Sequence, residues 1–349
     1  MTTKKLVFFE KWIDPLAETL IADEPGIETV RLSYDDPEEA NWRVMAEAHG
    51  YQIRPGAELR EPWYGSRELL ARCPNLLAIS TPGVGYDIID VPACTEAGVL
   101  VVNQEGANSQ AVAEHALGLM LALSKKIVTA DRALRQGGKL DRFLFTGNEL
   151  NGKTVGIVGF GNIGACLGRL CKAFDMTVLA YDPCLSEEII RQRGGRKVSL
   201  EDLLKASDFV SLNCPLTDDS AGLIGRDQFA LMKPTAYFVT TARGGIHKED
   251  DLAEALAAGR IAGAGLDVFV DEPPAPDHPL MQLDNVIATP HNAGLTAEAK
   301  QSMARSAVRQ WVSLFAGGPP RAAVNPEVWD RYAERYEGLF GVRPESPRP

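Results

Sequence analysis

Three residues that could carry proton transfer and anion binding each follow an apolar run that is predicted to be a strand: Arg243, Glu272 and His291. Ligands of an open α/β sheet bind beyond the carboxyl ends of its strands, so one crevice could hold all three. Histidine exchanges protons near neutral pH, a neighbouring carboxylate favours the imidazolium, and arginine holds a carboxylate through two hydrogen bonds. These are the groups that reduction of a 2-keto acid needs beside a hydride donor. Taken alone, each of the three could be an ordinary surface or packed residue. The occurrence of all three, in this order and after these strands, favours a functional site.

A glycine-rich turn could supply the hydride donor's binding site. Gly159-Phe160-Gly161-Asn162-Ile163-Gly164 follows the apolar run 155–158 and precedes a helical pattern. In such a turn the first glycine allows the tight bend, the second lets the backbone approach a pyrophosphate, and the third lets helix and strand pack closely. The helix N-terminus then presents free N–H groups to the phosphates. The alternative is a structural turn that holds no nucleotide.

An acidic residue at the end of the next strand indicates which dinucleotide would bind. Asp182 lies 18 residues after Gly164, at the end of the run 177–181. A carboxylate there can accept hydrogen bonds from the ribose hydroxyls of NAD and would repel the 2′-phosphate of NADP. No arginine follows Asp182 directly. The sequence therefore predicts NAD as the cofactor.

Composition limits the class of protein. The chain has 349 residues, which is enough for about two domains. Its net charge of −11 disfavours binding to nucleic acid, whose phosphates it would repel. The six cysteines show neither Cys-x-x-Cys pairs nor zinc spacing, so we expect core thiols in a reducing compartment and no metal site. The N-terminus resembles a first strand rather than a signal peptide, and no window is apolar enough to span a membrane, which favours the cytoplasm.

The first hundred residues alternate short apolar runs with amphipathic stretches, a pattern typical of a parallel sheet covered on both faces. Helices are expected at 37–49 and 66–72, and one long helix at 109–135, which could link domains or support a subunit contact. The expected strands are 5–10, 28–33, 50–54, 76–80 and 99–104.

A second series of alternating strands and helices starts at residue 154. Its strands are nearly continuously apolar, as central parallel strands are, and six strands with helical crossovers match a doubly wound dinucleotide-binding domain. A further helix is expected from residue 296 to about 316. The remaining chain is either partly disordered or docks a short helix through Trp329, Tyr332 and Tyr336. The expected strands are 155–160, 177–181, 209–213, 236–240, 263–268 and 286–288.

From about residue 5 to 325 the chain resembles the D-isomer-specific 2-hydroxyacid dehydrogenases. The resemblance implies an α/β fold of two doubly wound domains, a Rossmann NAD-binding domain inserted in a discontinuous flavodoxin-like substrate domain. The implied boundaries are 1–104 and 296–330 for the substrate domain, 105–295 for the NAD-binding domain, and 331–349 for a C-terminal tail. The motifs that carry it, besides the glycine turn, are Gly83-Val84-Gly85-Tyr86-Asp87, Val112-Ala113-Glu114-His115, Asn213-Cys214-Pro215-Leu216-Thr217, Ala242-Arg243-Gly244-Gly245, Gly265-Leu266-Asp267-Val268-Phe269 and Thr289-Pro290-His291.

The resemblance also assigns roles. Arg243 would bind the substrate, His291 would be the general acid and base, and Glu272 its partner. Val84 and Gly85 would offer backbone N–H groups to the substrate carboxylate, and His115 is expected to be a packed helix residue. Family members are usually homodimers, through the nucleotide domain and the long helix. The implied cofactor-binding residues are Gly159, Gly161, Asn162, Ile163, Gly164, Asp182, Cys214, Pro215, Thr241, Ala242, Asp267 and Val112.

The substrate is less well defined, because several positions depart from the family's pattern. Many members have Asn at the Thr240 position, Thr-Pro at Gln104-Glu105, and an apolar residue or Thr at Asn292. Arg54 resembles an arginine that phosphoglycerate-oxidising members place near the substrate phosphate, or it is an ordinary surface residue at a strand end. The candidates are acids of the 3-phosphoglycerate, glycerate/hydroxypyruvate or glyoxylate type. Alternatives are an NAD-sensing corepressor-like protein on the same scaffold and a formate- or phosphite-type dehydrogenase.

Overall fold

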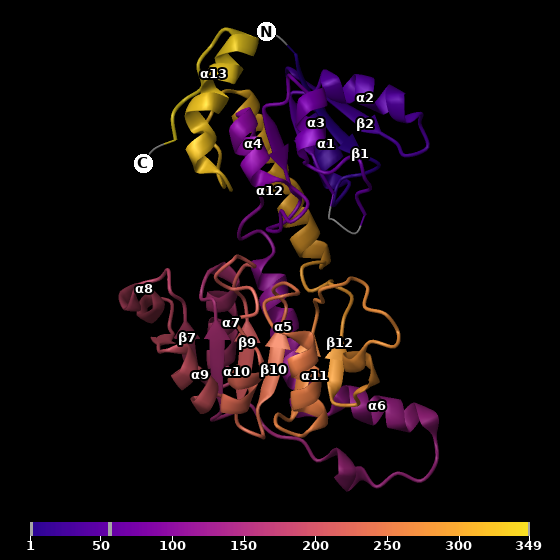
Figure 1. The fold of residues 1–349 in the computed structure, drawn as a ribbon, viewed down its shortest axis with the longest axis vertical. Coiled ribbons are helices and arrows are strands. Elements are labelled where there is room, and N and C mark those ends of the chain that lie inside the picture. Colours follow the sequence, from indigo (N-terminus) through magenta and orange to yellow (C-terminus); the bar gives the residue numbers. More distant parts are fainter. Residues whose placement is uncertain (1–2, 55–57, 348–349) are drawn as a thin grey trace. The chain divides into compact units, whose positions relative to one another are not determined.

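The computed structural model describes residues 3–54 and 58–347, and the chain divides into two compact units (Figure 1). Unit 1 contains Met1–Asn108 and Ala297–Pro349, and unit 2 contains Ser109–Thr296. The chain therefore leaves unit 1, builds unit 2, and returns to unit 1 with its last helices.

Unit 1 is built on a five-stranded parallel sheet with the order β2-β1-β3-β4-β5. This order is the flavodoxin-like one, and all five strands were predicted within a few residues of their observed bounds. The strands are β1 (Lys4–Phe9), β2 (Ile27–Leu32), β3 (Gly50–Gln52), β4 (Ala78–Ser80) and β5 (Leu100–Val102).

Side chains alternate along each strand, so both faces of this sheet carry apolar residues, and helices cover both faces. Leu6 and Phe8 of β1 point into a core with α1, α12 and α13, whereas Val7 and Phe9 point into a core with α2, α3 and α4. The helices are α1 (Leu16–Ala22), α2 (Glu38–Ala46), α3 (Arg67–Arg72), α4 (Val91–Ala97), α12 (Ala297–Phe315), η3 (Pro326–Val328) and α13 (Trp329–Phe340).

Helix α13 settles the question that the sequence left open at the C-terminal end. Tyr332 and Tyr336 are buried in the core of unit 1, and Tyr336 Oη donates a hydrogen bond to Phe315 O at 2.9 Å. Arg335 donates to the carbonyls of Pro74 and Leu76, both at 2.8 Å. These contacts dock the helix on unit 1. Residues 348–349 of the predicted tail lie outside the described residues.

Unit 2 has a seven-stranded parallel sheet with the order β12-β11-β10-β9-β6-β7-β8. The strand order reverses between β6 and β9, which is the switch point where dinucleotides bind in this architecture. The prediction of two doubly wound α/β units is thus confirmed, although the two-residue strand β8 was not predicted. The strands are β6 (Thr154–Val158), β7 (Thr177–Tyr181), β8 (Arg196–Lys197), β9 (Phe209–Leu212), β10 (Tyr237–Thr240), β11 (Gly263–Leu266) and β12 (Val286–Ala288).

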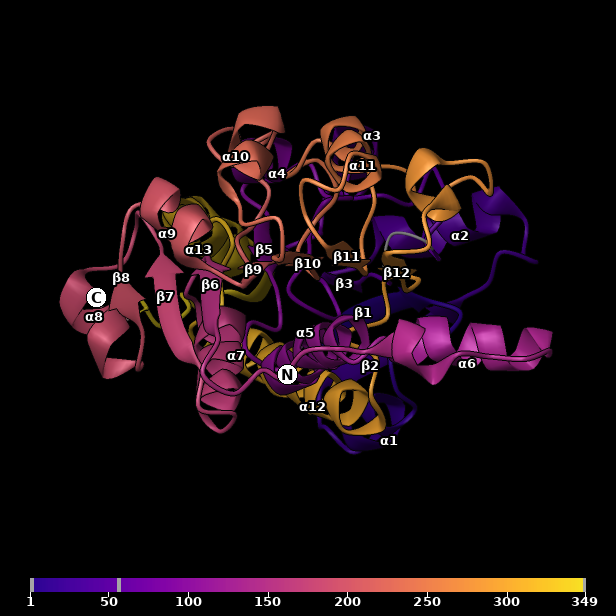
Figure 2. The same ribbon diagram turned by 90° about the horizontal axis from the view of Figure 1, so that it is seen from below.

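In unit 2, α5 and α7 pack on one face of the sheet, and α9, α10 and α11 on the other (Figure 2). Helix α6 extends past the β12 edge of the sheet and has no buried residue. No helix in the described ranges is both long and apolar enough to cross a membrane. The helices are α5 (Ser109–Ser124), α6 (Ile127–Gln136), η1 (Arg142–Phe145), α7 (Asn162–Lys172), α8 (Glu187–Gln192), α9 (Leu200–Ala206), α10 (Arg226–Leu231), α11 (Glu249–Ala257) and η2 (Pro279–Gln282).

The prediction of one helix over 109–135 was wrong, because two helices occupy this stretch. Lys126 has a left-handed backbone with φ of 54°, which separates α5 from α6. Asn148 N–H donates to Ser124 O at 2.8 Å, and Ser124 Oγ donates to Asn148 O at 2.9 Å. A distant segment thus takes up the last carbonyl of α5 and ends the helix, a tertiary effect that helical periodicity does not contain.

Candidate active site

A hydrogen-bonded histidine–carboxylate pair lies beyond the carboxyl ends of β11 and β12. His291 Nδ1 is 2.7 Å from Glu272 Oε2, and Phe269 N–H donates to Glu272 Oε1 at 3.0 Å. Burial raises the pKa of Glu272, but the hydrogen bonds from His291 and Phe269 outweigh it, so the net pKa is lowered. The carboxylate is therefore ionised at neutral pH. Because Nδ1 faces Glu272, Nε2 is the nitrogen that can exchange a proton with a ligand.

Asp267, which directly follows β11, fixes the loop that carries His291. This aspartate is 1% exposed, and its carboxylate accepts hydrogen bonds from Asn292 N–H and Ala293 N–H, each at 3.0 Å. Its carbonyl accepts from His291 N–H at 2.9 Å. His291 itself has a left-handed backbone with φ of 49°, which costs free energy and persists only where surrounding contacts hold it. The imidazole is thus placed by a rigid frame.

His115 belongs to this frame, a connection that the sequence did not predict. Thr289 Oγ1 donates to Asp267 Oδ1 at 2.6 Å, and His115 Nε2 lies 3.0 Å from Thr289 Oγ1. Since the threonine proton is used on Asp267, His115 Nε2 donates to the threonine oxygen. The sequence alone indicates only that this residue packs on a helix. Its position in the Val112–His115 motif was a signal, but only the fold shows that α5 brings it to the loop after β12.

Arg243 completes a set that follows three neighbouring strands, β10, β11 and β12. Its Nη1 donates to Ala242 O at 2.7 Å, and its positive charge contributes to lowering the pKa of Glu272. The loops after β10 and β11 are in close contact: a Cβ on Gly244 would lie 2.1 Å from Phe269 O. The structure therefore brings Arg243, Glu272 and His291 to one edge of the sheet.

The glycine turn after β6 has the geometry that its three glycines predict. Gly159 has φ of 86°, and a Cβ there would lie 2.6 Å from Cys214 N. A Cβ on Gly164 would lie 2.1 Å from Gly159 O, so the start of α7 packs directly on the turn. A Cβ on Gly161 would meet nothing within 4 Å. The turn thus encloses open space at its second glycine, where a pyrophosphate would approach the N-terminus of α7, which also carries Asn162 and Ile163.

Polar groups beside the turn also fit a dinucleotide. Asp182 Oδ2 accepts from Phe160 N–H at 2.8 Å, so this carboxylate adjoins the glycine turn. Thr241 Oγ1 is buried and has no hydrogen-bond partner among the described residues, which leaves it available to a ligand. Cys214 and Pro215 follow β9 at the switch point, and burial raises the pKa of the Cys214 thiol to about 11. Val112 is buried on α5.

The remaining predicted site residues belong to unit 1. Arg54 forms an ion pair with Glu58. Val84 O accepts from Asn103 Nδ2 at 3.0 Å, and Thr81 Oγ1 donates to Gly83 O at 3.0 Å, which fixes the backbone next to Gly85.

Comparison with known proteins identifies the family. The sequence profile for "D-isomer specific 2-hydroxyacid dehydrogenase, NAD binding domain" matches residues 117–293. A glyoxylate reductase of Thermofilum pendens is 41% identical over 266 residues, which are 75% of this chain and 78% of that protein. The chain belongs to the D-isomer-specific 2-hydroxyacid dehydrogenase family. Unit 2 is its NAD-binding domain.

Other relatives support the same conclusion. A D-3-phosphoglycerate dehydrogenase of Archaeoglobus fulgidus is 45% identical over 258 residues, 74% of this chain. The chain matches only 49% of that protein's length. The crystal structure of a glyoxylate reductase from Paecilomyes thermophila has a TM-score of 0.80 at 26% identity, covering 94% of this chain and all of that one (100%). The relatives' names thus differ in substrate within one family.

Proposed function

We propose that the chain is an NAD-dependent oxidoreductase that transfers a hydride between NAD(H) and C2 of a small D-2-hydroxy acid or 2-keto acid. The observation that carries the proposal is the 2.7 Å pair of His291 and Glu272 beyond the sheet of an NAD-binding domain. Proton transfer to or from C2 oxygen must accompany hydride transfer, and a histidine with an ionised partner is the group suited to it near neutral pH.

The residues have distinct tasks in this proposal. In the reduction direction, bound NADH would be the source of the hydride for C2. His291 Nε2–H gives its proton to the developing alkoxide, so that the carbonyl becomes a hydroxyl, and Glu272 stabilises the imidazolium beforehand. Arg243 and the backbone N–H groups of Val84 and Gly85 hold the substrate carboxylate.

The cofactor would be held mainly by backbone. The N–H groups around Gly161 would face the pyrophosphate, and Asp182 would accept from the adenosine ribose hydroxyls, which favours NAD over NADP. The Asp267 carboxylate already accepts three hydrogen bonds, from Thr289, Asn292 and Ala293. A carboxylate has about four acceptor positions, so one is left for the nicotinamide carboxamide. The other residues proposed to line the site are Gly159, Asn162, Ile163, Gly164, Cys214, Pro215, Thr241, Ala242 and Val112.

The substrate proposal covers acids of the 3-phosphoglycerate, glycerate/hydroxypyruvate and glyoxylate types. Arg54 would interact with a distal anionic group, such as a phosphate, in exchange for its ion pair with Glu58. A substrate without such a group would leave this ion pair intact. The relative reduction rates of phosphohydroxypyruvate and hydroxypyruvate in an Arg54→Gln variant distinguish these cases, since only the phosphorylated substrate should lose binding.

We also propose a cytoplasmic homodimer. All six cysteines are free, as expected in a reducing compartment. Large apolar side chains on α6 and η1 are exposed, among them Leu134 at 70% and Phe143 at 72%. A second copy of unit 2 would cover them, since apolar side chains gathered on a projecting helix mark association surfaces.

The direct test of the proton-transfer role compares two histidine–glutamate pairs of unit 2. His291→Gln should lower kcat for keto-acid reduction by about 10²–10⁴-fold, because general acid catalysis is lost, and leave NADH affinity unchanged. The control is His278→Gln, whose histidine lies 3.1 Å from Glu249 in a similar pair, and it should keep kcat within about twofold. Equal kcat in wild type and His291→Gln would refute the role. NADH binding without turnover in the wild type would favour an NAD-sensing protein instead.

A further inference from the structure

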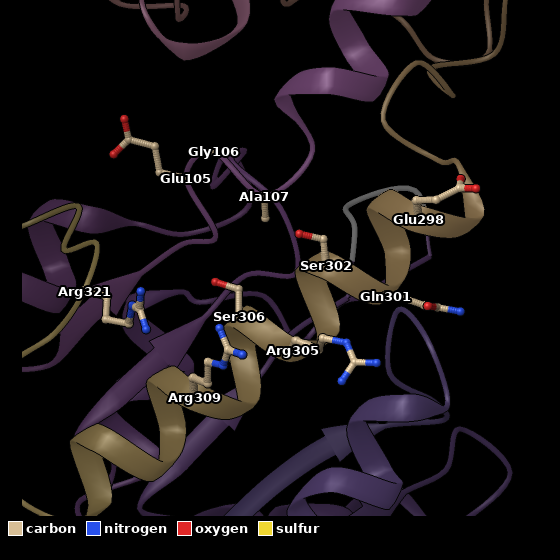
Figure 3. A pocket seen from close by; sticks show the side chains of 10 residues that line it. All are labelled: Glu105, Gly106, Ala107, Glu298, Gln301, Ser302, Arg305, Ser306, Arg309 and Arg321. Atoms are coloured by element: carbon tan, nitrogen blue, oxygen red, sulfur yellow. The ribbon is translucent and has the colours of Figure 1, made fainter.

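A pocket of about 470 Å³ on unit 1 gathers three arginines that the proposed reaction does not use (Figure 3). Arg305 and Arg309 are on α12, and Arg321 follows it in the loop that leads to η3. Two serine hydroxyls of α12, on Ser302 and Ser306, face the same space. The other lining residues are Glu105, Gly106, Ala107, Glu298 and Gln301.

No carboxylate in the described part of the chain forms an ion pair with any of the three arginines: none lies within 4.0 Å of Arg305, Arg309 or Arg321. Arg305 and Arg309 are also four residues apart on one helix, a spacing at which like charges repel. The two acidic residues of the pocket, Glu105 and Glu298, lie at its ends, and their carboxylates point away from the arginines (Figure 3). Unneutralised positive charge is thus concentrated on a chain whose net charge is −11.

The backbone that carries Arg321 is held rigidly against α12. Arg321 N–H donates to Gln310 Oε1 at 3.1 Å, and Gln310 is 1% exposed. Gly318 N–H donates to Ser313 O at 2.8 Å, and Asn103 N–H donates to Ala322 O at 3.2 Å. Arg321 and Arg309 are thus carried by fixed stretches of backbone and line the same pocket as Ser306 (Figure 3). A site whose parts are already in place loses less entropy when a ligand binds.

We propose that this pocket binds a small anion with two or more negative charges, held by Arg309, Arg321 and the Ser306 hydroxyl. Guanidinium groups bind phosphate and carboxylate through paired hydrogen bonds, and two of them suit a ligand with two anionic groups. The volume is that of a metabolite site. A nucleic acid is disfavoured because the rest of the chain would repel it. All the lining residues belong to unit 1, and none was assigned to hydride or proton transfer.

The test is calorimetric titration of the full chain with inorganic pyrophosphate and, separately, citrate at low ionic strength. NAD⁺ is saturating throughout, so that the glycine turn is not available to pyrophosphate. Binding of at least one probe is expected, and Arg309→Gln/Arg321→Gln should raise its Kd at least about tenfold. Each single variant should raise it less. The matched control is Arg43→Gln, since Arg43 is an exposed helical arginine of unit 1 that donates to Glu39 O within its own helix.

Three results would overturn the proposal. Wild-type protein that binds neither probe has no such site. An unchanged Kd in the double variant would place the bound anion elsewhere, for example at Arg243. Tighter binding of a short single-stranded DNA than of either probe, with the same loss in the double variant, would assign the pocket to nucleic acid. Circular dichroism and NADH affinity establish that the variants fold, and the single variants serve if the double variant does not.

Discussion

At the scale of single residues, two histidines of unit 2 have very different surroundings. His291 Nδ1 is hydrogen-bonded to an ionised Glu272, which fixes the orientation of the ring. His247 is 1% exposed, neither of its ring nitrogens has a partner among the described residues, and burial lowers its pKa to about 4. Proton transfer is therefore proposed for His291, whereas His247 is kept neutral by its surroundings.

The buried His247 makes the stability of unit 2 depend on pH. Because its folded-state pKa of about 4 is below the ordinary 6.5, the unfolded chain binds a proton more readily between these values. The contribution of the neutral His247 to the free energy of unfolding is therefore complete above pH 6.5 and is lost as the pH falls toward 4. This group should account for about 2 kcal/mol of the loss in unfolding free energy between pH 7 and pH 5.

Urea unfolding of wild type and His247→Leu at both pH values measures this contribution. The variant should lose about 2 kcal/mol less than wild type over the interval, whatever its stability at pH 7. Equal losses in the two proteins would show that His247 is not kept neutral in the folded state. Glu272 is present in both proteins, so its own pH dependence cancels in the difference between their losses.

At the scale of elements, periodicity predicted most strands because central parallel strands are apolar along their whole length. The turn, the acid after β7 and the loop residues after β10, β11 and β12 also followed from local sequence. Three features did not: the break at Lys126, the two-residue strand β8, and the connection of His115 to Thr289. Each depends on contacts between distant segments, such as Asn148 with Ser124, that a local pattern does not encode.

The glycine turn and α7 allow cofactor binding to be separated from folding. Gly161→Ala adds a Cβ that meets no protein atom within 4 Å, at a negative φ of −68°. Its melting temperature should therefore stay within a few degrees of the wild-type value. The same Cβ would occupy the space proposed for the pyrophosphate, so Kd for NADH should rise at least about tenfold. Fluorescence titration with NADH measures the change.

The matched control is Gly118→Ala on α5, where a Cβ also meets nothing within 4 Å. A helix-interior glycine replaced by alanine should gain up to about 1 kcal/mol of stability. NADH affinity should not change in this variant. If Gly161→Ala bound NADH as tightly as Gly118→Ala does, the pyrophosphate would not lie against the turn.

At the scale of the whole molecule, the proposed homodimer gives an account of the exposed apolar residues at one end of unit 2. Leu134→Glu/Phe143→Glu should sediment as a monomer, because charges on the proposed interface would have to be desolvated. The control Val342→Glu, which changes an apolar residue of unit 1 exposed to 65%, should remain dimeric. Analytical ultracentrifugation distinguishes these states. A wild-type monomer at micromolar concentration, or a dimeric double variant, would contradict the proposed interface.

Arg243, Glu272 and His291 belong to unit 2, whereas Arg54, Val84 and Gly85, for which substrate binding is proposed, belong to unit 1. The proposed activity is reversible hydride transfer between NAD(H) and a 2-keto acid. It is tested most directly by NADH oxidation with glyoxylate, hydroxypyruvate, phosphohydroxypyruvate and pyruvate. At least one should be reduced, faster with NADH than with NADPH, and any chiral product should be the D-isomer. Reduction of none of the four by protein that binds NADH, or formation of an L-product, would contradict the account.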